Sequence, residues 1–320
     1  MTQTGGFIPA TRRPGVLGVH SARRLVMTVP DVETARRFYV DFGLNTNARG
    51  DCLDVSIQGQ AGPCLTIAEG PRKRVHHLSL AAFEDDIPRF ALHLKECGVE
   101  RLAPPADFES NGLWFRDHDG MLVEICVAPK TTPDRKGTVL WPAAVENSAR
   151  APSRSQARKA PPTRMSHVLF FTSNVDKAVN FYTRVIGLRL SDRAGDDIAF
   201  MHGVHGSDHH LIAFVKSNGP GLHHCSFDVP SLEAVGLGAK AMADKGHERG
   251  WGMGRHVLGS NYFHYVRDPW GSYAEYSCDM DFVAADHDWE AHDNKAEDAF
   301  YVWGPTPPTD FAKNYEISDE

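Results

Sequence analysis

The stretch HVLFFTSNVDKAVNFYTRVIGL, residues 167–188, has a counterpart earlier in the same chain. The segment RLVMTVPDVETARRFYVDFGL, residues 24–44, aligns with it without a gap as far as a shared Phe-Tyr pair. Each copy begins with an apolar run typical of a strand. It continues through a turn that contains an aspartate and ends with apolar residues at helical spacing. The chain therefore begins the same strand–helix unit twice.

Two further phrases recur in the same order. The segment RVHHLSLAA (74–82) corresponds to GLHHCSFDV (221–229), and FRDHDGMLVEICV (115–127) corresponds to VRDPWGSYAEYSC (266–278). The Asp-x-x-Gly turn between two extended runs in the last pair predicts a hairpin. The repeat therefore extends over most of each half of the chain.

A segment between the two halves has a different composition. Residues 148–164, SARAPSRSQARKAPPTR, are rich in Pro, Ala, Ser and Arg, which is typical of an exposed linker. We expect an N-terminal domain over residues 1–130, a linker over 131–163, and a C-terminal domain with a tail over 164–320.

Each half is predicted to be a pair of βαβββ units. This predicts an α+β fold in which tandem modules pair into two cup-shaped, barrel-like domains. Alternate residues of a strand face the same side of a sheet. We therefore expect Leu222 and His224 to face the inside of the cup, and His223 to face away from it, toward a packing helix.

Composition and charge exclude several classes of protein. The 320 residues are 42% hydrophobic and 23% charged, which is typical of a globular protein with room for two cores. The formal net charge of −7 argues against nucleic acid as the main partner. No run approaches the roughly 18 apolar residues of a membrane span. The six cysteines form no CxxC pair, so a reduced, cytoplasmic protein is expected.

Three potential metal ligands occupy duplicated strand positions in the C-terminal half. His167, His224 and Glu275 lie on three separate predicted strands, and the same counting places their side chains in the cup. Two imidazoles and one carboxylate form the ligand set that leaves positions open on a non-haem Fe(II) for substrate and oxygen. We therefore predict a metal site in this half.

The N-terminal half lacks one of these ligands. His77 and Glu124 occupy the matching positions, but Arg24 stands where His167 stands. A guanidinium stays protonated and has no lone pair to donate. We expect a non-catalytic cup in which Arg24 pairs with Glu124.

The C-terminal half resembles the type I extradiol catechol dioxygenases of the vicinal oxygen chelate (glyoxalase-like) superfamily, and is similar to dihydroxybiphenyl and catechol 2,3-dioxygenases. The resemblance depends on HVLFF, DHHLIAF, GLHHCSF and the long segment GRHVLGSNYFHYVRDPWGSYAEY (254–276). It implies Fe(II), with Mn(II) as an alternative, bound by His167, His224 and Glu275. It also implies cleavage of an aromatic diol by O2 next to the vicinal hydroxyls, and a homo-oligomer.

The resemblance also implies three catalytic side chains. His210 would contact dioxygen and act as acid–base, with His209 as a rival, and His256 and Tyr265 would hydrogen-bond the substrate near the metal.

Two segments bear on the size and polarity of the pocket. Residues 199–208, which include His202 and His205, are predicted at the pocket rim and favour a small substituted or extra-hydroxylated monocyclic catechol. The tail from Asp281 is expected over the C-terminal cup or at a subunit contact.

Two other functions are possible on the same scaffold. A metal-dependent glyoxalase-type isomerase would use the three ligands but leave His256 and Tyr265 without a role. A metal-free small-molecule-binding resistance protein would leave all six residues unexplained. The formation of a yellow ring-fission product from a catechol separates the dioxygenase from both.

Overall fold

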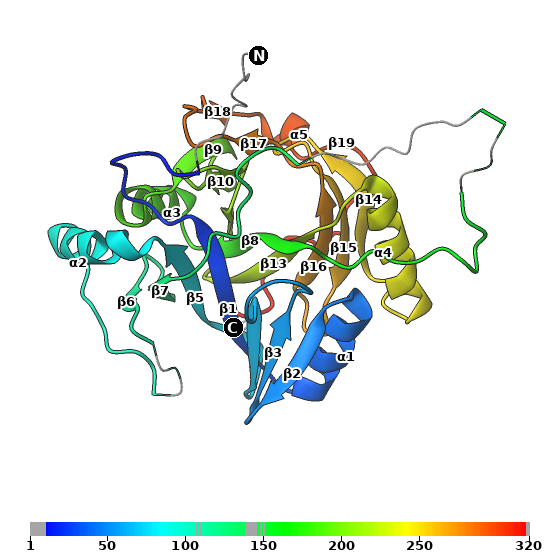
Figure 1. Cartoon of the computed structure of the whole chain (residues 1–320), viewed down its shortest axis with the longest axis horizontal. Helices are drawn as coiled ribbons and strands as arrows, with labels where there is room; N and C mark the ends of the chain where they lie inside the picture. The colour runs from blue at the N-terminus through cyan, green and yellow to red at the C-terminus, as the bar shows by residue number, and fades with distance from the viewer. Residues whose placement is uncertain are drawn as a thin grey trace, which may run out of the picture.

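The computed structural model describes residues 11–106, 108, 110–137, 146–147, 149 and 151–317. The strands of the two halves form two large sheets (Figure 1). Part of the predicted linker, residues 138–145, 148 and 150, lies outside the described residues. Within the described ranges, no helix is long and apolar enough to cross a bilayer.

The N-terminal sheet has seven strands in the order β2-β3-β4-β1-β5-β7-β6. Its elements are β1 (Ser21–Val29), α1 (Val32–Phe42), β2 (Asn45–Arg49), β3 (Cys52–Ser56), β4 (Leu65–Glu69), β5 (Arg74–Ala82), a short 3-10 turn (Glu84–Asp86), α2 (Ile87–Glu96), β6 (Leu113–Arg116) and β7 (Leu122–Val127).

The C-terminal sheet has ten strands in the order β18-β9-β10-β12-β8-β13-β16-β15-β14-β19. The elements up to the tail are β8 (Arg164–Thr172), α3 (Val175–Phe181), a π-turn (Tyr182–Ile186), β9 (Arg189–Ala194), β10 (Ile198–His202), β11 (Ser207–Asp208), β12 (Ile212–Lys216), β13 (Gly221–Asp228), α4 (Leu232–Asp244), β14 (Gly250–His256), β15 (Tyr262–Arg267) and β16 (Tyr273–Cys278). The tail contributes β17 (Phe282–Val283), β18 (His292–Asp293), α5 (Ala296–Ala299) and β19 (Tyr301–Trp303).

The strand pairing repeats between the halves. Strand β1 pairs in parallel with β4 and antiparallel with β5, and β8 pairs in the same way with β12 and β13. The first strand of each half therefore joins two modules into one sheet. The predicted α+β fold of tandem βαβββ modules is confirmed.

The first helix of each half begins at an equivalent cap. The Asp31 side chain accepts a hydrogen bond from the backbone N–H of Thr34, and the Asn174 side chain accepts one from the backbone N–H of Lys177. Such caps satisfy N–H groups that have no partner inside the helix. Gly43 ends α1 with a left-handed φ of 106°, which glycine adopts without the cost of a Cβ clash.

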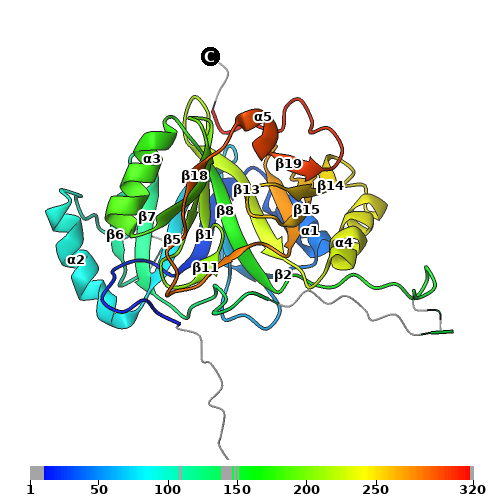
Figure 2. The same cartoon turned by 90° about the horizontal axis from the view of Figure 1, so that it is seen from above.

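The two halves pack closely against each other. Helices α2 and α3 lie at one end of the molecule and α1 and α4 at the other, with the strands between them (Figure 2). At the α1 end, the Phe42 ring stacks on Tyr276 at 3.9 Å, and the Tyr276 hydroxyl donates to the Phe42 carbonyl. The first module therefore supports β16, the strand that carries Glu275.

The C-terminal tail covers the C-terminal sheet. Strands β17, β18 and β19 pair with β11, β9 and β14. Near the end of the chain, the Glu316 carboxylate accepts from the backbone N–H of Leu222 and lies 3.8 Å from Lys73 Nζ. Lys73 is also 3.4 Å from Asp268 Oδ2. The tail thus contacts both halves, and it lies over the predicted cup.

Candidate metal centre

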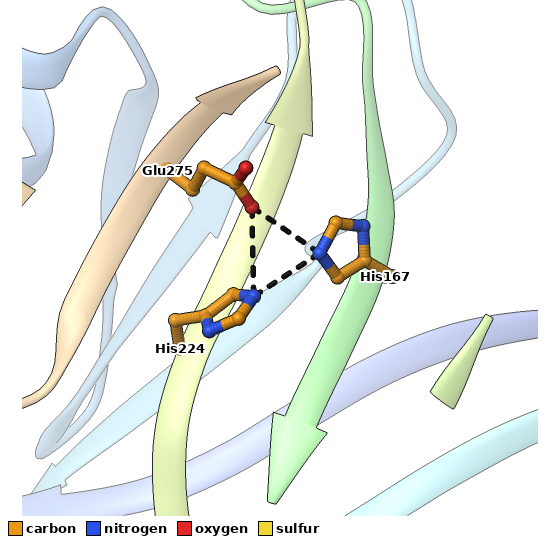
Figure 3. A group of neighbouring side chains, drawn as sticks. All are labelled: His167, His224 and Glu275. Carbon is orange, nitrogen blue, oxygen red and sulfur yellow. Dashed lines mark hydrogen bonds and ion pairs between the residues drawn. The ribbon is translucent and has the colours of Figure 1, made fainter. Parts of the chain in front are cut away.

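The structure brings the three predicted ligands together. His167, His224 and Glu275 come from β8, β13 and β16, which are neighbours in the C-terminal sheet. Their side chains point toward one another in Figure 3. The two Nε2 atoms are 3.1 Å apart, and Glu275 Oε2 lies 3.2 Å from that of His167 and 3.5 Å from that of His224. Among the described residues, this is the only group with geometry suited to a metal ion.

The donors fit a divalent transition metal. Glu275 Oε2 is buried and has no hydrogen-bond partner, which is costly for a carboxylate oxygen unless a cation satisfies it. Burial lowers the pKa of His224 well below its usual range, so this imidazole is neutral and keeps a lone pair. Two imidazole nitrogens and one carboxylate oxygen suit Fe(II) or Mn(II).

Outer contacts orient the three ligands. The Nδ1 atom of His167 is 3.2 Å from the Ser166 hydroxyl, and that of His224 is 2.7 Å from His223 Nδ1. Asn261 donates through Nδ2 to Glu275 Oε1 at 3.3 Å. Such partners fix ring orientation and leave the other nitrogen free for a metal. Nothing in the sequence singled out Asn261.

The histidine doublets mark a β-bulge. The register of β13 on β8 shifts between Leu222 and His224, and that of β5 on β1 shifts at the matching position, between His77 and Val75. A bulge adds one residue and reverses the alternation beyond it. Leu222 therefore packs in the core with Cys225 and Phe227, and His223 lines a cavity beside the metal ligands. The predicted faces of Leu222 and His223 were wrong, whereas that of His224 holds.

The N-terminal cup differs from the prediction in its contacts. Both oxygens of the buried Glu124 accept hydrogen bonds from serine hydroxyls, those of Ser79 and Ser110. The Arg24 guanidinium lies 5.7 Å from the centre of the Phe108 ring. The predicted Arg24–Glu124 pair was wrong because two nearby hydroxyls already satisfy the carboxylate.

A cavity of about 220 Å³ opens beside the three ligands. His210 lines this cavity, and its ring centre is 4.2 Å from that of His167. Burial lowers the pKa of His210 well below its usual range. His209 is not among the described lining residues and contacts His210 from behind. The structure thus places His210, rather than its rival, in the cavity.

His256 and Tyr265 form a hydrogen-bonded pair in the same cavity. His256 Nδ1 lies 2.9 Å from the Phe300 carbonyl oxygen, which can only accept, so Nδ1–H donates. Its Nε2 then accepts from the Tyr265 hydroxyl at 2.9 Å. Burial raises the pKa of Tyr265 well above its usual range and lowers that of His256, so both groups are neutral.

The remaining walls are mostly apolar. They include Leu169, Ile198, Phe200, Val215, Leu258, Ala299, Phe300, Phe311 and Ala312. Of these, Ala299, Phe300, Phe311 and Ala312 come from the tail. Most of these residues could not be predicted from the sequence, because a phenylalanine that faces a cavity and one in the core occur in the same apolar sequence patterns.

The predicted polar rim was wrong for both histidines. His202 and His205 are buried away from the described cavity lining. His202 Nδ1 lies 2.8 Å from the Ser191 hydroxyl, and His205 Nδ1 accepts from the backbone N–H of Arg13.

Comparisons with known proteins show which proteins the chain resembles in sequence and in fold. The model of the Glyoxalase/Bleomycin resistance protein/Dioxygenase superfamily matches residues 21–125 and 164–276. Metapyrocatechase 2 from Cupriavidus necator is 45% identical over 299 residues, which are 93% of each chain. A manganese-dependent 2,3-dihydroxybiphenyl 1,2-dioxygenase from Geobacillus genomosp. 3 is 24% identical over 88% of this chain and 92% of its own. The Mn(II)-bound glyoxalase from Novosphingobium aromaticivorans superposes with a TM-score of 0.73 at 25% identity, covering 91% of this chain and 93% of its own.

Proposed function

Because the chain belongs to the Glyoxalase/Bleomycin resistance protein/Dioxygenase superfamily and is an extradiol ring-cleaving dioxygenase, we propose that it opens a small monocyclic catechol with O2 at an Fe(II) ion. His167, His224 and Glu275 would hold the ion. The observation that carries this proposal is the convergence of these ligands beside a cavity that His210, His256 and Tyr265 also line.

The choice of metal rests on the ligand set and the relatives. When bound, the ion would supply Lewis acidity and redox activity for the reaction of a catechol with dioxygen. We propose Fe(II) from the resemblance to the extradiol enzymes. Mn(II) remains the alternative because it accepts the same donors, and because one relative is manganese-dependent and another contains Mn(II).

The protein's own groups would position the diol and move its protons. The Tyr265 hydroxyl and His256 Nε2 lie within hydrogen-bond distance of each other and can each turn to a substrate oxygen. His210 is neutral, so it can take a proton from a hydroxyl and return it to a leaving oxygen. The presence of His256 and Tyr265 favours ring cleavage over a glyoxalase-type reaction, because neither residue has a role in the latter.

The cavity supports a small, uncharged substrate. A volume of about 220 Å³ is below the roughly 300–1,000 Å³ of sites for drug-sized ligands. Asp197 is the one acidic residue among the described lining residues, and that lining contains no lysine or arginine. We therefore propose a catechol with an apolar ring substituent, because apolar walls leave an additional hydroxyl without a partner.

Reconstitution tests this function. Metal-free protein is loaded with Fe(II) or Mn(II) without oxygen and mixed with catechol, 3-methylcatechol, 1,2,3-trihydroxybenzene, 3,4-dihydroxyphenylacetate and 2,3-dihydroxybiphenyl, and air is then admitted. We expect a yellow product, formed fastest from catechol or methylcatechol and with Fe(II). The absence of yellow product with all five compounds and both metals would refute ring cleavage.

The organisation of the whole protein remains part of the proposal. We propose that residues 1–130 form a supporting domain, that 131–163 link it to the catalytic residues 164–320, and that the chain forms a homo-oligomer. The two separate family matches support the division into two domains and a linker, because they fall on either side of residues 126–163.

A further inference from the structure

Two buried side chains stand directly behind His210. His209 Nδ1 lies 3.1 Å from His210 Nδ1, and on its other side His209 Nε2 lies 2.8 Å from Asp192 Oδ2. His209 is fully buried, and Asp192 is 7% exposed. The three side chains form a line from the cavity into β9.

The tail completes this line at its outer end. Asp192 Oδ1 accepts from the backbone N–H of His292 at 2.9 Å, where β18 pairs with β9. Trp289 donates through Nε1 to the Ser191 carbonyl at 3.0 Å, and its ring packs on His209. Each Asp192 oxygen thus has one donor, which fixes the carboxylate.

The protons along this line can be assigned from its outer end. A carboxylate only accepts, so His209 Nε2 must donate to Asp192. In a neutral His209, Nδ1 then carries a lone pair. The short Nδ1···Nδ1 contact needs one proton, which must therefore come from His210 Nδ1. His210 is left with its lone pair on Nε2, the nitrogen not engaged by His209.

We propose that His209 and Asp192 are positioning residues that hold His210 as the Nδ1–H tautomer, with a basic Nε2 available to the substrate. This inference rests on the proposed dioxygenase function for its catalytic meaning. An aspartate that fixes the tautomer of a neighbouring histidine has the same role in serine proteases. Here the effect passes through a second imidazole.

Nitrogen-15 NMR of the labelled, metal-free protein tests the tautomer directly. Long-range ¹H–¹⁵N spectra distinguish Nδ1–H from Nε2–H, and His210→Phe identifies the His210 signals. We expect Nδ1–H at His210 in the wild type. We expect Nε2–H, or a mixture of tautomers, in Asp192→Asn and His209→Phe. The kcat of the Fe(II)-loaded variants for catechol should fall roughly 100-fold, the lower range for loss of acid–base catalysis, with little change in KM.

Two further variants separate positioning from packing. His209→Asn places an amide oxygen near the position of Nδ1, so it should restore the Nδ1–H tautomer at His210 and most of kcat. Asp208→Asn removes another buried carboxylate of the same half, one bonded to Arg164 rather than to a histidine. This control should leave the His210 tautomer unchanged.

Two results would overturn the inference: Nε2–H at His210 in the wild type, or Nδ1–H retained in His209→Phe and Asp192→Asn. Failure of the proposed function is distinguishable, because a protein that cleaves no catechol would still give the tautomer spectra.

Discussion

At the scale of single residues, the two halves differ at one of the three positions that supply the metal ligands. His77 and Glu124 repeat His224 and Glu275, but Arg24 replaces His167. The ligand set could be predicted from the sequence because histidine and glutamate recur at strand positions that duplication keeps in register. The partners of Glu124 could not, because the serine hydroxyls that bind it come from a strand neighbour and a loop.

We expect His224→Ala to abolish metal retention, because it removes one of three donors, and His77→Ala to leave turnover per folded molecule nearly unchanged. Bound metal by elemental analysis and turnover of a catechol check both variants. Equal losses in the two would contradict a single site in the C-terminal half.

We expect Arg24→His to create no second metal site. The oxygens of Glu124 already accept hydrogen bonds from Ser79 and Ser110, so they are held by these hydroxyls, whereas Glu275 Oε2 has no hydrogen-bond partner. Titration with Fe(II) under anaerobic conditions should give one ion per chain in this variant, as in the wild type. Two ions per chain would show that Arg24 alone prevents metal binding in the N-terminal cup.

We expect His210→Phe to retain metal and substrate binding but to lower kcat roughly 100-fold or more, because proton transfer typically contributes 10²–10⁴-fold. Single-turnover kinetics after anaerobic binding of catechol separate the two steps. Unchanged turnover would transfer the acid–base role to another group.

At the scale of elements, the directions of the side chains around the double histidine could be predicted only in part from the sequence. Simple alternation predicted the face of His224 correctly, but it failed for Leu222 and His223 because a bulge adds one residue to β13. A bulge depends on pairing with β8, and a strand read in isolation does not reveal it. The same limit applies to the tail, whose pairing with β9 and β14 joins residues far apart in sequence.

We expect Phe311→Ala to enlarge the cavity and to shift the preference toward larger rings, because this side chain forms part of the tail's wall. Stability should fall by about 3 kcal/mol, as for other buried phenylalanines. Values of kcat/KM for catechol and 2,3-dihydroxybiphenyl, with urea unfolding, measure both effects. Val302→Ala, in the same tail but exposed, is the matched control.

At the scale of the whole molecule, buried histidines at several places couple folding to pH. Burial lowers the pKa of His20, His202 and His205 to about 4. Between pH 6.5 and 4 the unfolded chain therefore binds more protons than the folded chain, so the unfolding free energy falls as the pH falls. Above pH 6.5 these groups are neutral in both states and have no such effect.

We expect each of these histidines to contribute a slope of up to about 1.4 kcal/mol per pH unit within that window. Urea unfolding of the metal-free protein at a series of pH values measures the total slope. His20→Gln should reduce it by up to one proton. A slope that this substitution leaves unchanged would mean that His20 titrates normally in the folded state.

The position of the tail has a consequence for protein synthesis. Phe300, Phe311 and Glu316 are synthesised after all three metal ligands, yet Phe300 and Phe311 line the cavity and Glu316 pairs with Lys73. A nascent polypeptide can form its first sheet early, but it cannot enclose a substrate until the tail has been synthesised. A premature stop codon shortly before Phe300 would therefore yield a protein with all three metal ligands and an open reaction chamber.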